Sequence, residues 1–271
     1  MLLFKDGRRK SLQVVLACSF KKSLSMAARK FYIGTSGWSY QHWREIFYPG
    51  DLAVTKWLTF YAQTFDITEI NTSFYHLPKP KTVLNWAEKV PKGFKFCPKL
   101  SRYITHMKKL KEPEEPLQRF FEVFDPVRRV LGPVLVQLPP SLKFDYDRAD
   151  HFYRVLRKEY RKYSFVIEVR HNTWLDEDSL TLMSKYNVGF VISQSGNVFP
   201  YSEAVTAKNI YVRFHGPGYL YASPYSDEML HEYAGKFKRW AKDGHVIWAF
   251  FNNDVHGHAF RDAQKLMALL K

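Results

Sequence analysis

The chain has 271 residues, of which 46% are hydrophobic and 17% aromatic, and its formal net charge is +15 at pH 7. This length and apolar content suit one large core, and the lack of any apolar run near ~18 residues excludes a membrane-spanning helix. The two cysteines are too few for a disulfide framework and have no metal-binding spacing, so we expect a reducing, cytoplasmic location.

The positive charge is concentrated at the N-terminus. Residues 1–30 carry +7, and the rest of the chain carries +8. An apolar stretch between "GRRK" and "KKS" is too short for a typical signal peptide, and Met26 would serve well as a start. We interpret 1–30 as a basic, dispensable extension, with a targeting signal as the alternative, and 31–271 as the folded domain. The remaining charge favours an anionic partner or belongs to a solvated surface.

Short apolar runs alternate with helical patterns from residue 31 onward. Strands are predicted over residues 31–35, 67–71, 94–98, 133–140, 165–169, 188–193, 209–216 and 245–251. Helices are predicted over residues 54–65, 80–89, 117–131 (with a kink at Pro126), 149–156, 176–186, 229–241 and 259–270. Eight β/α units in about 240 residues are typical of the α/β class and of a single TIM-type (β/α)8 barrel, here without a full helix between the sixth and seventh strands.

Polar side chains gather at the C-terminal ends of these strands, where TIM barrels carry their active sites. Since side chains alternate along a strand, Glu168 and Arg170 share one face, as do Arg213 and His215, and these faces point into the barrel mouth. The candidate catalytic residues are Glu69, Glu168 and His215. The candidate substrate-binding residues are Trp38, Asn71, Tyr75, Lys99, His106, Gln137, Arg170, His171, Arg213, Asn253 and Asp254.

Two interpretations of Glu168 and its arginines remain open. Arg170 and Arg213 would hold an anionic group while Glu168 acts as a general base or acid, with Glu69 as a second carboxylate. Alternatively, Glu168 and Arg170 form an ion pair that braces the barrel mouth. The first interpretation predicts that Glu168→Gln changes the free energy of unfolding by less than ~1 kcal/mol, whereas the second predicts a loss of ~3–5 kcal/mol.

The loops after the seventh and eighth strands offer a second set of alternatives. Gly216, Gly218 and Gly257 would let backbone N–H groups approach a phosphate, or they only turn the chain. The aromatic residues of 38–48 stack against a sugar or base, or fill the barrel mouth as packing. The basic segment 99–113 is either a solvated flap or a loop that follows phosphates.

Several residues at the strand ends are of the types that bind Zn, Mn or Fe. They are Glu69, His106, Glu168, His171, His215, Asp254 and His256. The "HGH" at 256–258 precedes a helix instead of ending a strand, and the nearby arginines would repel a cation. We therefore predict no cofactor, with a divalent metal as the less favoured alternative.

Seven segments of the chain resemble the successive motifs of one family, the domain of unknown function 72 family, also called YecE-like. They are "GTSGWSY" (34–40), "EINTSFY" (69–75), "GFKFCPKLSRYITH" (93–106), "LGPVLVQLPP" (131–140), "EVRHNTW" (168–174), "YVRFHG" (211–216) and "FFNNDVHGHA" (250–259). The resemblance spans residues 31–271, implies a TIM barrel, and leaves the biochemical activity open.

The favoured prediction is an enzyme that uses general acid/base chemistry on a small anionic substrate at the barrel mouth. Hydrolases, lyases and isomerases are included, as are phosphorylated and sugar-containing substrates. The alternative prediction is a nucleic-acid-binding protein, with or without metal-dependent nuclease activity.

Overall fold

The computed structural model describes residues 30–271. The predicted extension over 1–30 therefore lies outside the described residues, apart from Lys30. Eight parallel strands form one sheet in the order β3-β2-β1-β8-β7-β6-β5-β4. The strands are β1 (Phe31–Thr35), β2 (Ile67–Ile70), β3 (Lys95–Pro98), β4 (Val134–Gln137), β5 (Phe165–Glu168), β6 (Gly189–Gln194), β7 (Asn209–Phe214) and β8 (Val246–Phe251). Backbone bridges from Phe96 to Leu131 and from Lys99 to Leu135 join β3 to the β4 region and nearly close the barrel.

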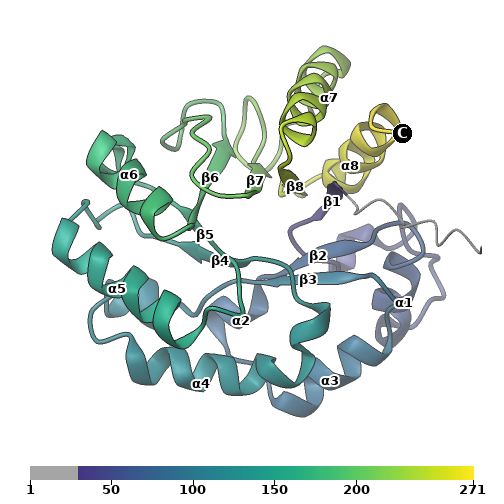
Figure 1. The fold of residues 1–271 in the computed structure, drawn as a ribbon. Coiled ribbons are helices and arrows are strands. Elements are labelled where there is room, and N and C mark those ends of the chain that lie inside the picture. The colour runs from purple at the N-terminus through teal and green to yellow at the C-terminus, as the bar shows by residue number, and fades with distance from the viewer. Residues whose placement is uncertain (1–29) are drawn as a thin grey trace, which may run out of the picture.

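Helices surround the strands (Figure 1). The α-helices are α1 (Trp57–Tyr61), α2 (Thr72–Tyr75), α3 (Pro80–Glu88), α4 (Glu114–Phe124), α5 (Tyr146–Glu159), α6 (Glu177–Lys185), α7 (Asp227–Lys242) and α8 (His258–Leu269). Short helices of other types are η1 (Gln41–Trp43), η2 (Val54–Lys56), η3 (Tyr103–Met107), η4 (Asp125–Val130) and η5 (Asn172–Leu175). The segment between β6 and β7 contains no helix. The predicted α/β barrel, with no full helix at this point, is confirmed.

Two predicted helices differ in detail from the observed ones. The helix expected over 54–65 consists of η2 followed by α1, which ends at Tyr61. The kink expected at Pro126 is a change of helix type, because α4 ends at Phe124 and the 3₁₀ helix η4 begins at Asp125. Proline suits the first turn of a helix, where its missing N–H would have no partner.

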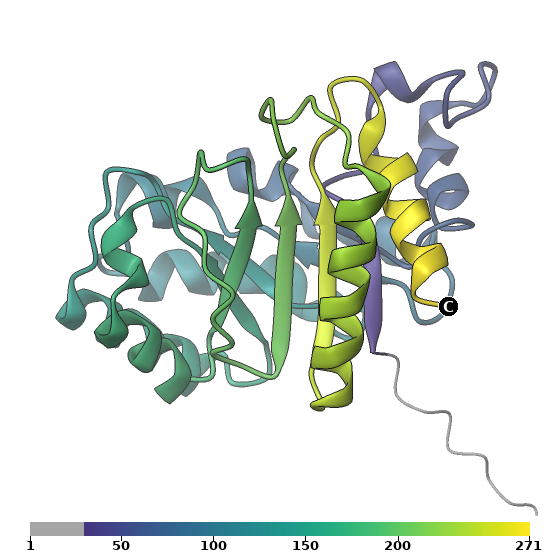
Figure 2. The ribbon, with the colours of Figure 1, turned by 90° about the horizontal axis from the view of Figure 1, so that it is seen from above.

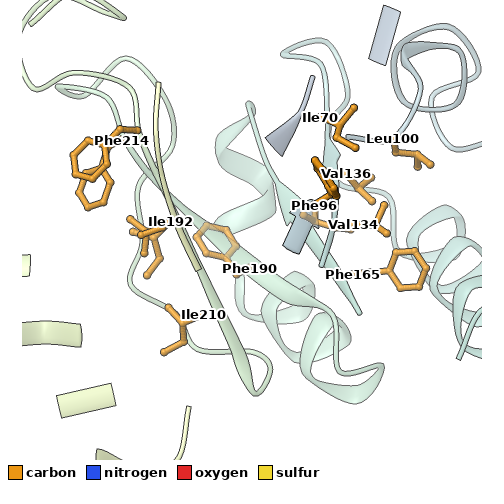
Figure 3. Close-up of a cluster of buried hydrophobic side chains, with 14 of the residues drawn as sticks. Ile70, Phe96, Leu100, Val134, Val136, Phe165, Phe190, Ile192, Ile210 and Phe214 are labelled. Atoms are coloured by element: carbon orange, nitrogen blue, oxygen red, sulfur yellow. The ribbon is translucent and has the colours of Figure 1, made fainter. Parts of the chain in front are cut away.

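The core has two layers that follow from side-chain alternation. The barrel interior holds Ile67, Cys97, Leu135, Val166, Val191, Tyr211, Trp248 and Phe250. The layer between sheet and helices includes Phe165, Ile192, Ile210 and Phe214, which Figure 3 shows together with further members. Along β7, Tyr211 therefore points inward while Ile210 and Phe214 point outward, as predicted. The inward face of each strand continues to the barrel mouth and determines which polar side chains meet there.

All eight strands run in the same direction, so their C-terminal ends lie at one end of the barrel (Figure 2). The connections that follow the strands at this end provide the remaining walls of the site. Within residues 30–271 no helix is both long and apolar enough to cross a membrane, as the sequence predicted. The cytoplasmic location stays a prediction.

Candidate active site

Arg213 of β7 joins two buried carboxylates at the barrel mouth. Its Nε donates to Oε1 of Glu69 at 2.9 Å, and its Nη2 donates to Oε2 of the same group at 2.8 Å. Its Nη1 donates to Oε2 of Glu168 at 2.7 Å. The side chains of Glu69 and Glu168 are 0% exposed and that of Arg213 is 3% exposed. Burial lowers the pKa of Arg213, but Glu168 and Glu69 outweigh it and raise that pKa above its ordinary value.

The second oxygen of Glu168 is also fully used. Its Oε1 accepts from Ser193 Oγ at 2.9 Å and from His215 Nε2 at 2.8 Å, and it forms an ion pair with Arg170 Nη2 at 2.9 Å. Burial raises the pKa of Glu168, but Arg170, Arg213 and His215 together outweigh burial and hold the pKa well below its usual range. Glu168 is therefore ionised at neutral pH and is a weak base.

His215 is a buried link between Glu168 and Asn252. The Nδ2 atom of Asn252 lies 3.0 Å from Nδ1 of His215. An amide nitrogen only donates, so Nδ1 accepts and the ring proton is on Nε2, which donates to Glu168. Burial lowers the pKa of His215 to about 4 although Glu168 acts in the opposite direction. His215 is therefore neutral at pH 7.

A cavity of about 840 Å³ opens over this cluster. Side chains at the ends of six strands line it: Asn71, Lys99, Gln137, Arg170, Arg213 and Asn252. Residues of the neighbouring loops and short helices complete it: Tyr40, His42, Phe74, Tyr75, Arg102, His106, Tyr221, Asp254 and Val255. The structure thus brings most of the predicted site residues into one cavity.

Lys99, which follows β3, is the least compensated charge in this cavity. Lys99 is 9% exposed, and its Nζ lies 4.1 Å from the ring centroid of Phe74. Its ammonium forms no hydrogen bond or ion pair with any residue of 30–271, whereas Arg170 and Arg213 are paired with carboxylates. Burial, followed by Arg213, lowers the pKa of Lys99 to about 7, although Glu168 and Glu69 oppose this shift. Lys99 can therefore exchange a proton near neutral pH.

His106 and Gln137 form the wall beside Lys99. The Nδ1 atom of His106 lies 2.8 Å from Thr105 Oγ1, and its Nε2 lies 3.5 Å from Gln137 Nε2. Burial, with further contributions from Lys99 and Arg102, lowers the pKa of His106 to about 4. This wall is consequently neutral at pH 7 and does not offset the charge of Lys99.

Asp254 forms the opposite wall with two aromatic residues of the first loop. Its Oδ1 accepts from Trp43 Nε1 at 2.6 Å, and its Oδ2 lies 3.1 Å from His42 Nε2. Burial raises the pKa of Asp254. Asp254 does not cap α8, since the residue before that helix is Gly257.

A second cavity of about 410 Å³ adjoins the first and shares Tyr40, Asn71 and Tyr75 with it. Its wall includes the predicted residue Trp38, whose ring lies edge-on to Trp86 with centroids 5.4 Å apart. The packing interpretation of the aromatic residues of 38–48 holds for only some of them, and stacking against a ligand stays a prediction for the others. Trp43 and Tyr48 are buried as packing, whereas residues 38 and 40 face the cavities.

Four predicted site residues line neither cavity. Glu168 and His215 belong to the buried cluster described above, whereas His171 and Asn253 lie apart from it. The Nδ1 atom of His171 accepts from the backbone N–H of Thr173 at 3.2 Å and caps η5. Asn253 is buried and donates to Asp262 at 2.7 Å and to the carbonyl of Ser223 at 3.0 Å. His171 and Asn253 follow β5 and β8, at positions that strand alternation would place outward.

Sequence reasoning also missed residues that line the cavity. Asn252 is the one that a sequence signal could have identified, because Trp248 and Phe250 point inward and alternation places residue 252 on the same face. The others lie in loops and short helices, where no periodic pattern indicates a direction: His42, Phe74, Arg102, Tyr221 and Val255. Tyr40 was considered only as one of the aromatic residues of 38–48.

Two of the three glycines predicted to approach a phosphate use their backbone N–H groups internally. Gly216 donates to the hydroxyl of Tyr225 at 2.9 Å, and Gly257 donates to the carbonyl of Asp254 at 2.8 Å. These two groups are not available to a phosphate. Within residues 30–271, no group of three or more His, Cys, Asp or Glu side chains is arranged to hold a metal ion.

Comparisons with known proteins place these residues in a wider context. The sequence model of a family described as "Protein of unknown function DUF72" matches residues 32–271. The chain is 31% identical over 183 residues to the UPF0759 protein YecE of Escherichia coli strain K12, and the match covers 64% of this chain and 64% of YecE, just under two thirds of that relative. It is 24% identical over 274 residues to the UPF0759 protein YunF of Bacillus subtilis strain 168, covering 88% of this chain and 94% of YunF.

Two solved structures have the same fold. A DUF72 family protein from Thermotoga maritima matches with a TM-score of 0.79 at 26% identity, over 89% of this chain and 99% of the other. A DUF72 family protein from Enterococcus faecalis matches with a TM-score of 0.77 at 20% identity, over 89% of this chain and 95% of the other, which supports the fold alone.

Proposed function

Because the chain belongs to the DUF72 family, whose description leaves the activity open, we propose a function from its own site. The protein is an enzyme that binds a small anionic substrate in the mouth cavity and transfers a proton on it through Lys99. The observation that carries this proposal is the buried ammonium of Lys99, which faces the cavity without a hydrogen-bonding partner among residues 30–271.

The charge balance of the cavity supports an anionic substrate. Arg170 and Arg213 are balanced by Glu69 and Glu168, which leaves Lys99 and the exposed Arg102 as cations without a paired carboxylate in the described residues. A phosphate or carboxylate group would accept hydrogen bonds from both and would supply the missing negative charge.

The titration properties support proton transfer by Lys99. A general acid or base works best when its pKa lies near the working pH, and the pKa of Lys99 is about 7. Arg170 and Arg213 hold Glu168 ionised. Glu168 therefore lacks the raised pKa that the general acid of a two-carboxylate glycosidase needs. Of the three predicted enzyme classes (hydrolase, lyase and isomerase), the titration properties of Lys99 and Glu168 favour a lyase or an isomerase.

The second cavity is suited to an uncharged part of the same substrate. Trp38, Tyr75 and Trp86 provide aromatic surfaces of the kind that stack against a sugar ring. Since the two cavities share Tyr40, Asn71 and Tyr75, one molecule can occupy both. A phosphorylated sugar has these two parts.

The proposal is tested by anion binding. We expect inorganic phosphate to bind the full chain saturably in isothermal titration calorimetry at pH 6.5. Lys99→Met should weaken this binding by about 10- to 100-fold, since a charge-assisted hydrogen bond contributes ~1.5–3 kcal/mol. Lys158→Met on α5 is the matched control, because this side chain is 79% exposed, and it should leave the affinity unchanged. Equal phosphate affinity of the wild type and Lys99→Met would overturn the proposal.

Turnover is tested on the ligands that bind. Small phosphates and carboxylates that pass the binding screen are incubated with the protein in D₂O, and exchange of their carbon-bound protons is followed by NMR. We expect exchange with at least one of them, and its loss in Lys99→Met. Binding without any exchange would support a binding protein instead of an enzyme.

A further inference from the structure

We infer that the amine of Lys99 is a nucleophile that forms an imine with an aldehyde or ketone group of its substrate. This inference rests on the proposed function, because the carbonyl compound would carry the anionic group that the same cavity binds. It adds a covalent step and restricts the substrate class to anionic carbonyl compounds.

The backbone holds Lys99 in place from several sides. Its N–H donates to the carbonyl of Ile70 at 3.1 Å, and its own carbonyl accepts from Ser73 Oγ at 2.7 Å. A backbone bridge to Leu135 fixes it on the other side. The side chain extends from this fixed point over the Phe74 ring into the cavity. A nucleophile needs such positioning, because attack requires the amine to be held at the reacting carbon.

Lys99 differs from the lysines whose ammonium groups bind other parts of residues 30–271 in having no hydrogen-bonding partner. Lys95, for example, donates to the carbonyl of Arg129. Lys236 binds Glu203 and Glu232, and Lys265 binds Asp227. A buried lysine that only stabilised the fold would need a comparable partner, because an unpaired buried charge is costly. The position of Lys99 is therefore better explained by reactivity than by stability.

The charges around Lys99 favour its unprotonated form. Arg213 of β7 and Arg170, which follows β5, act on it across the cavity, and Arg102 lines the same cavity. Glu69 and Glu168 also face it but are bound by arginine. His106 is adjacent and neutral at pH 7. Burial is the largest cause that lowers the pKa of Lys99 to about 7, and Arg213 and Arg170 act in the same direction, whereas Glu168 and Glu69 oppose the shift. A large fraction of the amine is therefore free to attack a carbonyl near neutral pH.

The step is balanced without an oxidant or reductant. The Nζ lone pair attacks the carbonyl carbon, the nitrogen loses a proton and the oxygen gains one, which gives a carbinolamine. Loss of the hydroxyl group as water then forms the C=N bond, so amine and carbonyl yield imine and water. A protonated imine withdraws electrons from the neighbouring carbon, which assists the bond cleavage of a lyase and the proton transfer of an isomerase.

The experiment traps the imine on the full chain. Pyridoxal 5′-phosphate, an anionic aldehyde, is added in equimolar amount at pH 7, the imine is reduced with borohydride, and the modified lysine is located by peptide mass mapping. We expect Lys99 to be labelled at least about tenfold more than the exposed Lys158, because the unprotonated fraction of an amine follows its pKa. Excess inorganic phosphate should protect Lys99 and leave Lys158 unaffected.

The outcomes separate this inference from the proposed function. Labelling confined to exposed lysines, in a protein that binds phosphate in the cavity, would overturn the imine and leave the proposed function standing. Lack of both labelling and phosphate binding would overturn both. Mapping the label on the wild-type protein is decisive even if Lys99 variants fail to fold. Glyoxylate, a smaller anionic aldehyde, used with cyanoborohydride should also label Lys99 more than any other lysine, and preferential labelling of another lysine would contradict the inference.

Discussion

Glu168 of β5 and Arg213 of β7 meet through a hydrogen bond of 2.7 Å between Oε2 and Nη1, and both side chains are buried. Arg213 also binds Glu69 of β2 through two further hydrogen bonds. The charges therefore balance across strands that are not neighbours in the sheet. The sequence left open whether Glu168 is a general acid or base or part of a structural ion pair. This geometry favours the structural ion pair, and we place the reacting group at Lys99 in the same cavity.

Glu168→Gln is expected to destabilise the fold. The variant leaves Arg170 and Arg213 buried with less negative charge, and removal of one partner of a buried ion pair costs roughly 3–5 kcal/mol. Urea melts measure this loss. Glu115→Gln on α4 is the control, because Glu115 and its partner Arg119 are 58% and 75% exposed, and exposed pairs contribute less than about 1 kcal/mol. A loss below ~1 kcal/mol for Glu168→Gln would instead support a reacting carboxylate.

Lys99→Met should change how stability depends on pH. The pKa of Lys99 is lowered from 10.5 to about 7 in the folded state. The contribution of Lys99 to wild-type stability is therefore fully present above pH 10.5 and is lost as the pH falls through 7. We expect Lys99→Met to gain on the order of 3 kcal/mol relative to the wild type between pH 10 and pH 6 in urea melts. Lys158→Met should show no such change, and a pH-independent difference for Lys99→Met would indicate an ordinary pKa.

Asn252→Asp should raise the pKa of His215. The new carboxylate would replace the amide nitrogen 3.0 Å from Nδ1, and a close opposite charge raises a histidine pKa by about 1–3 units. NMR titration of the ring protons should show this rise from a starting value of about 4. Asn252→Leu, which adds no charge, should leave the pKa of His215 low. An unchanged titration in Asn252→Asp would show that Asn252 does not control the protonation of this ring.

The sequence predicted the fold well, because alternation and apolar runs are direct consequences of burial. The apolar residues of β5 and β7 identified both the strands and their outward faces. The inaccurate parts were local. The extent of α1 was overestimated because Val54, Trp57 and Tyr61 fit one helical face, although η2 and α1 share that pattern.

The orientation of candidate site residues was predicted correctly where they lie on strands, because side-chain alternation along a strand shows which residues point inward. Glu168 and Arg213 were found in this way, whereas Asn253 was chosen in place of Asn252 because the rule was not extended along β8. The special property of Lys99 could not be predicted, since it depends on burial and on arginines from distant strands. Such a shift is a property of the folded arrangement and leaves no pattern in the sequence.

Nucleic-acid binding remains the rival prediction, and its salt dependence distinguishes it. The test uses a chain that begins at Met26, so that most of the positive charge of residues 1–30 is removed. We expect only weak binding of duplex DNA at ~50 mM salt, unchanged by Lys99→Met. Tight binding that falls with a log–log slope near −0.9 per phosphate, and that Lys99→Met weakens, would favour the rival.

The central claim is that the Lys99 amine titrates near neutral pH in a cavity that binds anions. NMR of the full chain with ¹³Cε-labelled lysine tests this claim most directly. Lys99→Arg identifies the signal by removing it. We expect its chemical shift to titrate with a midpoint near pH 7, and saturating inorganic phosphate to raise that midpoint, because a bound anion favours the ammonium form. A midpoint near 10 that phosphate does not change would contradict the claim.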